Sequence, residues 1–124
     1  MTMPDERTRA LRWGFELLAH LEDDSDLTEP LRARALATLP DYPSPQRLEQ
    51  LISSDAQGLP RSWANAMSKA RGLFDEIWFG QHGSTETRHH LLYTLRHHPD
   101  EETIRAMACT DSLSDWLLPE DHYR

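Results

Sequence analysis

The sequence predicts an all-α protein, a bundle of about six helices formed by two tandem three-helix repeats. Three observations support this prediction. Apolar residues recur at spacings of three and four, as on one face of an amphipathic helix. Prolines and capping residues stand where these segments begin. Related residues also recur 56 positions apart, so that Leu36, Thr38, Leu39 and Pro43 return as Leu92, Thr94, Leu95 and Pro99.

A first helix is expected over about residues 4–22. Thr2 is the expected cap, Pro4 stands in the first turn, and Asp5 supplies a carboxylate three residues after the cap. Trp13 lies at the edge of the apolar stripe and is expected to pack against a neighbouring helix. The stripe itself consists of Ala10, Leu11, Gly14, Phe15, Leu17, Leu18 and Leu21.

The acidic run at residues 22–26 lacks the glycine and the glutamate spacing of a calcium loop, so a solvated loop is expected. Asp26 or Thr28 then caps a second helix that carries Pro30 in its first turn and ends at Pro40. Its inward side is predicted to consist of Leu31, Ala35, Leu36 and Leu39.

A third, short helix starts at Ser44 and Pro45, and residues 53–58 form a linker. The second copy is predicted to have helices near residues 61–79, 85–98 and 101–110. A shift of 56 positions maps Pro4 onto Pro60 and Ser44 onto Asp100. The organisation predicted is repeat 1 at residues 1–56, repeat 2 at residues 57–112 and an acidic, apolar tail at residues 113–124, within one compact unit.

Composition narrows the class of protein. The 124 residues carry a net charge of −8, with 21 acidic and 13 basic residues, which opposes association with nucleic acid. The single cysteine, Cys109, excludes an internal disulfide and favours a reducing compartment. No apolar run is long enough to span a bilayer, and no signal peptide is recognisable, so a cytoplasmic protein without membrane contact is expected.

Two phrases in the sequence resemble a known family. Residues 1–10 carry Met-Thr-x-Pro-x-Glu-Arg-Thr-Arg-Ala intact. A second phrase, Leu-Leu-Arg-His-Tyr-Pro followed by Ser or Thr, is divided: residues 42–44 keep its end, whereas residues 95–97 and Pro99 keep its middle and His98 replaces the tyrosine. Residues 1–52 thus resemble a family of uncharacterised small bacterial proteins of one-repeat length. The resemblance implies a helical fold and a bacterial origin, and it carries over no catalytic residue.

Histidines form the main candidate site for chemistry. Glu86 and His90 have the four-residue spacing of two metal ligands on one helical face. His97 shares that face but lies about 10.5 Å further along the axis, too far for the same ion. The competing interpretation is a first-turn carboxylate beside a surface imidazole. No metal or other cofactor is therefore predicted, and Glu86, His90 and His97 remain weak candidates.

Signatures of enzymes are missing from the sequence. It has no Gly-x-Ser-x-Gly elbow, no phosphate loop and no Gly-x-Gly-x-x-Gly turn. Cys109 is expected to be a small core residue rather than a nucleophile. The sequence therefore predicts a protein without catalytic activity.

Exposed apolar residues supply the candidate partner-binding sites. Trp78 and Phe79 precede a glycine turn. Apolar surface exposed at such a helix end is also a candidate homodimer contact. The tail gathers apolar residues between acids, and it either docks in a partner's groove or packs on its own bundle. Its candidate residues are Leu113, Trp116, Leu117 and Leu118.

The function expected is protein–protein interaction, as in a regulator, adaptor or inhibitor that meets a more basic protein partner. The alternative is a His-dependent metal-binding or pH-responsive protein. A third hypothesis is a helix-turn-helix nucleic-acid binder, which the negative charge disfavours.

Overall fold

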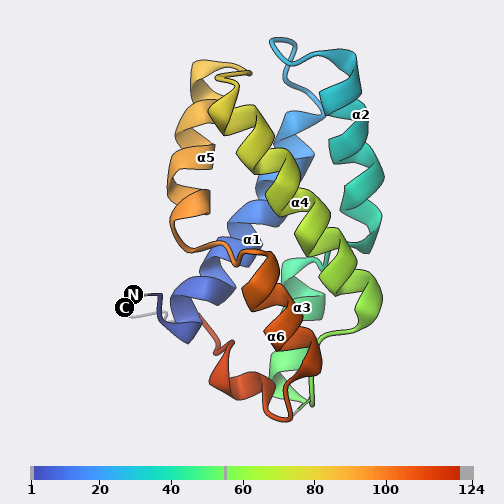
Figure 1. Cartoon of the computed structure of the whole chain (residues 1–124), viewed down its shortest axis with the longest axis vertical. Coiled ribbons are helices and arrows are strands. Elements are labelled where there is room, and N and C mark those ends of the chain that lie inside the picture. Colours follow the sequence, from blue (N-terminus) through green and yellow to red (C-terminus); the bar gives the residue numbers. More distant parts are fainter. Residues whose placement is uncertain (1, 55, 121–124) are drawn as a thin grey trace.

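The computed structural model describes residues 2–54 and 56–120; residues 121–124 of the predicted tail lie outside the described residues. The described chain is helical and contains no strand, which confirms the predicted all-α class (Figure 1). Its elements are α1 (Pro4–Leu21), α2 (Glu29–Thr38), the 3₁₀ turn η1 (Leu39–Asp41), α3 (Pro45–Ser53), α4 (Arg61–Phe79), α5 (Thr85–His97), α6 (Glu101–Cys109) and the 3₁₀ turn η2 (Leu113–Asp115).

Prolines and capping side chains determine where the helices begin. A proline occupies the first turn of α1, α2 and α3, where its missing N–H leaves no hydrogen bond unmade. Three cap side chains accept a hydrogen bond from the backbone N–H three residues later, which satisfies one of the free donors of each helix start. These caps are Ser44, Ser84 and Asp100.

The predicted cap of α1 is wrong by one residue. Met3, not Thr2, is the residue before the helix, and its N–H donates to the Glu6 carboxylate over 2.8 Å. The Thr2 hydroxyl instead lies 2.9 Å from Nδ1 of His97. Thr2 therefore links the start of α1 to the end of α5.

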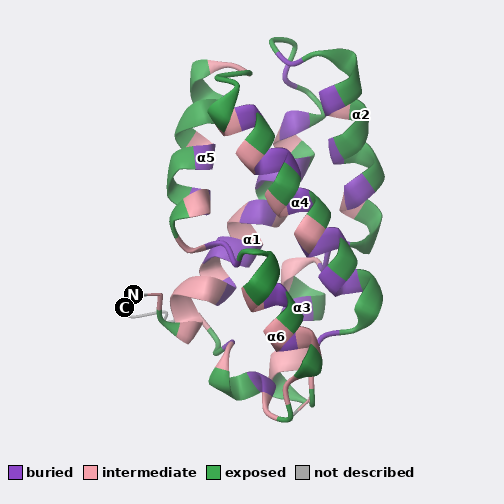
Figure 2. Ribbon diagram, in the orientation of Figure 1, coloured by how far each residue is buried: buried purple, intermediate pink, exposed green. Residues whose placement is uncertain are grey.

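Four helices form a closed ring. α1 packs against α2 and α5, and α4 packs against the same two helices. α3 and α6 lie at the end of the bundle where α1 and α4 begin, and α6 packs on α4 (Figure 1). Buried residues are concentrated on the faces that the helices turn toward one another (Figure 2). The apolar stripe predicted for α1 lies in this core, with Leu11, Leu17, Leu18 and Leu21 fully buried.

The inward face of α2 differs from the prediction. Leu31, Ala35 and Thr38 are buried, whereas Leu36 is 52% exposed. Thr38 can be buried because its hydroxyl donates to the carbonyl of Arg34 over 2.8 Å. The expected core position of Leu36 is therefore wrong: the inward positions of α2 recur at spacings of four and three, and Leu36 follows Ala35 by about 100° around the helix axis.

The centre of the bundle contains a close approach at Gly14. The Tyr42 hydroxyl donates to the carbonyl of Leu11 over 2.8 Å and lies 3.1 Å from Nε2 of His98. A Cβ at position 14 would overlap that hydroxyl and lie 3.1 Å from the His98 ring. Glycine at this position lets α1 approach two buried polar side chains.

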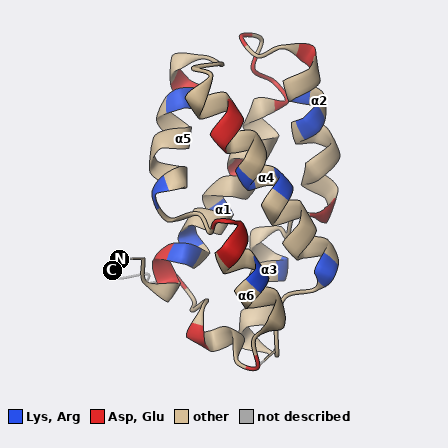
Figure 3. Cartoon of the chain, viewed as in Figure 1, with Lys and Arg blue, Asp and Glu red and all other residues tan. Residues whose placement is uncertain are grey.

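None of the described helices is long and apolar enough to cross a membrane. Acidic and basic residues are spread over the bundle in the view of Figure 3, and no helix there carries a continuous run of basic residues. The expectation that nucleic acid is not a partner remains a prediction.

Candidate functional site

A surface hollow lies where α4 ends and α5 begins. It has a volume of about 640 Å³, and we call it the α4–α5 groove. Its residues come from the last turn of α4, the connecting turn and the outer face of α5. They are Trp78, Phe79, Gln81, Thr85, Arg88, His89 and Leu92.

The tight turn between α4 and α5 forms one wall of this groove. Gly80 ends α4, and Gln81 and Gly83 adopt positive φ angles of 55° and 87°. The N–H of His82 donates to the carbonyl of Ile77 over 3.0 Å, which closes the turn on the helix end. Because the chain reverses within four residues, no following segment covers the end of α4.

Phe79 is consequently the most exposed of the large hydrophobic side chains, at 78%. Leu92 on α5 is 53% exposed, whereas Trp78 is partly buried and packs against the core. Arg88 and His89 supply the polar rim, and the lining includes no acidic residue. Among the described residues Arg88 forms no ion pair. The groove thus joins an apolar floor to an uncompensated positive charge.

A buried carboxylate holds the start of α5 in place. Asp24 accepts hydrogen bonds from the N–H of Ser84 over 3.0 Å and from the hydroxyl of Thr87. Burial by itself raises the pKa of Asp24, but these bonds and one from the N–H of Asp26 outweigh burial, so the pKa lies below its usual value. The acidic loop expected to be solvated therefore contains a buried clamp on α5.

Replacing Asp24 with alanine is expected to lower the free energy of unfolding by about 2 kcal/mol, because Ser84 and Thr87 lose a charged acceptor. Urea denaturation at neutral pH measures the change. The control is Asp23→Ala, which alters an exposed neighbour and should stay within about 0.5 kcal/mol. Equal effects of the two substitutions would contradict the clamp.

The tail packs on its own bundle as far as residue 120. Leu113 and Leu117 are buried in the core, which removes them from the candidate partner-binding residues. Trp116 is half-buried beneath the Arg7 guanidinium, 5.5 Å from the ring centroid, and Arg7 also donates to its carbonyl over 2.7 Å. Of the tail candidates, Leu118 is exposed.

The candidate metal ligands do not converge on one point. His90 stacks on Tyr93 at 5.0 Å between ring centroids, and Glu86 points toward His20, with 3.8 Å between the carboxylate and Nε2. His97 lies at the other end of α5, 3.6 Å from the Glu6 carboxylate. Within residues 2–54 and 56–120, no three His, Cys, Asp or Glu side chains are arranged to hold a metal ion.

His90 is partly buried between α5 and α1, and no described residue forms a hydrogen bond with its Nε2 atom. Burial, followed by the neighbouring His20, lowers the pKa of His90, which keeps the ring neutral near pH 7. A neutral ring that stacks on Tyr93 and lies 6.2 Å from the His20 ring of α1 between centroids contributes packing to the α1–α5 contact rather than a charge.

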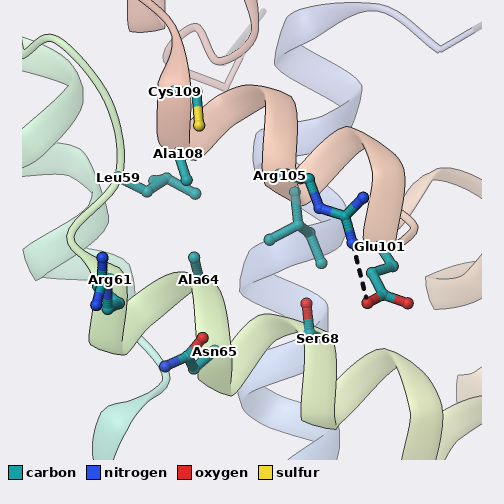
Figure 4. Close-up of a pocket in the computed structure, with 10 residues that line it drawn as sticks. Leu59, Arg61, Ala64, Asn65, Ser68, Glu101, Arg105, Ala108 and Cys109 are labelled. Atoms are coloured by element: carbon teal, nitrogen blue, oxygen red, sulfur yellow. Dashed lines mark hydrogen bonds and ion pairs between the residues drawn. The ribbon is translucent and has the colours of Figure 1, made fainter.

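A second groove, of about 380 Å³, separates α4 from α6 (Figure 4). Arg61 and Asn65 line it from α4, and Arg105 lines it from α6 while pairing with Glu101 at 3.5 Å. Cys109 stands at its edge and is exposed, so the expected core position of this cysteine is wrong. Position 109 falls on the outer side of α6, opposite the buried Ile104 and Met107.

The sequence was compared with models of protein families and with curated proteins, and the structure with solved structures. No match was found in any of the three comparisons.

Five of the seven residues that line the α4–α5 groove were not among the predicted site residues; they are Gln81, Thr85, Arg88, His89 and Leu92. The pattern of α5 could have indicated that Leu92 faces outward, because the inward residues Thr87, Leu91 and Thr94 recur at spacings of four and three. Leu92 follows Leu91 by about 100° around the helix axis and so lies away from that face. Leu92 lines the groove together with Phe79, which lies across the turn on α4. The local sequence around Leu92 does not predict that these two residues are neighbours.

Proposed function

We propose that this protein is a noncatalytic protein-binding module and that the α4–α5 groove receives an apolar side chain of its partner. The observation that carries the proposal is the 78% exposure of Phe79 beside the half-exposed Leu92. Aromatic side chains next to a hollow are typical anchors of protein interfaces, where they exclude water from the contact.

The fold does not require an aromatic pair at this place. The residues 56 positions before Trp78 and Phe79 are Glu22 and Asp23, at the end of α1, and both are exposed. An acidic pair therefore ends the first long helix where an aromatic pair ends the other. Solubility alone favours acidic residues at an exposed helix end. The exposed aromatic residues at the end of α4 therefore support a role in binding.

Charge complementarity indicates the chemistry of the partner. Arg88 stands on the rim of the groove without an acidic neighbour in the lining, so a carboxylate beside the partner's apolar side chain would pair with it. The net charge of −8 acts at longer range and favours a partner that is more basic as a whole. The proposed partner is thus a basic protein whose contacting segment presents an apolar side chain next to a carboxylate.

Leu92→Asp is expected to abolish capture of the partner, because it places a carboxylate in the apolar floor of the groove and close to Arg88. Leu36→Asp is the matched control: Leu36 has the same exposure, 52% against 53%, and also lies on the outer face of a helix. Affinity capture from the native cell with the two tagged variants and the parent protein makes the comparison.

A protein that is retained by the parent and by Leu36→Asp but lost from Leu92→Asp would support the groove as the binding surface. Phe79→Ser should reproduce the loss without adding charge. Equal retention by all variants, or equal loss in the two aspartate variants, would contradict the proposal. Circular dichroism melts of each variant establish that the fold is retained.

We also propose that the chain contains two copies of one three-helix unit. α3 and α6 begin and end 56 positions apart, and so do the starts of α2 and α5. The packing is consistent with an approximate two-fold relation, because α1 contacts α5 as α4 contacts α2. Tyr42 and His98, which are separated by 56 positions, touch each other at the centre, as expected for equivalent residues beside a symmetry axis.

A further inference from the structure

A small polar hollow lies between the start of α1, the middle of α4 and the turn from α5 to α6. It has a volume of about 220 Å³, and we call it the arginine hollow. Three guanidinium groups line it, from three different helices. The lining residues used below are Arg7, Arg71, Arg96, His97, Asp100 and Thr103.

Two of the arginines are held in place by backbone carbonyls. Arg71 donates from Nη1 to the carbonyl of His98 over 2.6 Å, and its Nε lies 3.2 Å from the Asp75 carboxylate. Arg7 donates from Nη1 to the carbonyl of Trp116 over 2.7 Å. A guanidinium has five N–H donors, so each of these groups keeps donors beyond the bonds that orient it.

Positive charge exceeds negative charge around the hollow. Asp100 is the one acidic residue in the lining, and its Oδ1 already accepts the N–H of Thr103 over 2.9 Å at the start of α6. Arg96 makes no ion pair with any described residue. Asp75 balances the charge of Arg71, whereas Arg7 forms no ion pair with any described residue. Arg7 and Arg96 against the single lining carboxylate of Asp100 leave a local excess of positive charge on a protein whose net charge is −8.

The fold does not need arginines at these positions. The residues 56 positions away from Arg7 and Arg71 are Trp63 and Phe15. At those positions aromatic rings make the contacts: the Arg47 guanidinium lies over the Trp63 ring at 5.0 Å, and Phe15 lies 6.4 Å from Tyr42 between ring centroids. Under the duplication proposed above, each of these two arginines stands where the other copy has an aromatic residue.

We propose that the arginine hollow binds a phosphate group, either as free inorganic phosphate or as a small phosphate monoester. Planar guanidinium groups match the oxygens of phosphate with two parallel hydrogen bonds each, and converging arginines are the usual means of holding such an anion. The His97 ring and the Thr103 side chain line the same space with further polar groups. The small volume suits one tetrahedral anion and excludes a large ligand from the interior of the hollow.

Isothermal titration calorimetry with inorganic phosphate and, separately, with phosphoserine tests the proposal on the full chain. Arg96→Glu should weaken binding at least about tenfold, because it replaces a charge-assisted donor with a repelling carboxylate. Arg61→Glu is the control: it makes the same change of net charge at an exposed residue outside the hollow. It should weaken binding less than about twofold, as a screened long-range effect.

Binding of inorganic phosphate alone, or of phosphoserine as well, would support the hollow and identify the source of the phosphate group. Absence of saturable binding of both up to about 20 mM would overturn the proposal, as would equal weakening by the two Arg→Glu substitutions, which indicates diffuse attraction. Arg96→Gln, which only removes the charge, should give an intermediate loss and keeps the test valid if the glutamate variant does not fold.

Discussion

Gly14→Ala is expected to lower the free energy of unfolding by about 3 kcal/mol. The new Cβ overlaps the hydroxyl of Tyr42, which is fully buried and cannot move without displacing the His98 ring. Overpacking of this kind destabilises by up to about 3 kcal/mol, and loss of the Tyr42 hydrogen bond adds about 1 kcal/mol. The higher helix propensity of alanine offsets about 1 kcal/mol of that sum.

Gly72→Ala is the matched control for this prediction. Gly72 is an exposed glycine inside α4, and a Cβ there meets no atom within 4 Å. It should therefore raise stability by about 0.5–1 kcal/mol through helix propensity alone. Urea denaturation of both variants gives the two values, and stabilisation by both substitutions would show that α1 does not approach Tyr42 as described.

Acidification is expected to remove about 3 kcal/mol of stability through His98. Burial lowers the pKa of this imidazole from 6.5 to about 4, so it is neutral in the folded protein. Between these pH values the unfolded chain binds one proton more than the folded chain. Stability is therefore fully present above about pH 6.5, falls as the pH falls toward 4, and loses nothing further through His98 below that value.

The variant His98→Gln separates this contribution from that of the carboxylates. It should be less stable than the parent at pH 7, because the imidazole packs against Phe74 and Tyr42, and the difference should shrink by about 3 kcal/mol at pH 4. Urea denaturation at half-unit steps of pH gives the difference curve. A constant difference from pH 7 to pH 4 would mean that His98 titrates alike in the folded and unfolded states.

Local sequence signals were sufficient for most helix starts. Prolines in first turns and the caps Ser44 and Asp100 act within three residues of where they stand, so the sequence predicts them. Ser84, which caps α5, was not predicted as a cap. The one misplaced cap, Thr2, also has a physical reason: Glu6 reaches the N–H of Met3, and the threonine hydroxyl finds a partner on α5.

The positions that sequence reasoning missed depend on contacts between distant segments. Asp24 looks like one member of a solvated acidic run until the start of α5 is placed against it. The arginine hollow gathers Arg7, Arg71 and Arg96 from helices far apart in the sequence, where each residue alone reads as a scattered surface charge. Of the candidate site, the pair at the end of α4 was predictable because the glycine turn that leaves Phe79 uncovered directly follows it.

Hydrogen–deuterium exchange of the protein with and without its captured partner tests the proposed binding surface most directly. Slower exchange in the partner complex is predicted for the end of α4 and for residues 80–92, while α2, whose exposed Leu36 matches Leu92, keeps its rate. Protection confined to α2, α3 or the tail, with residues 78–92 unchanged, would contradict the assignment of the α4–α5 groove as the site of binding.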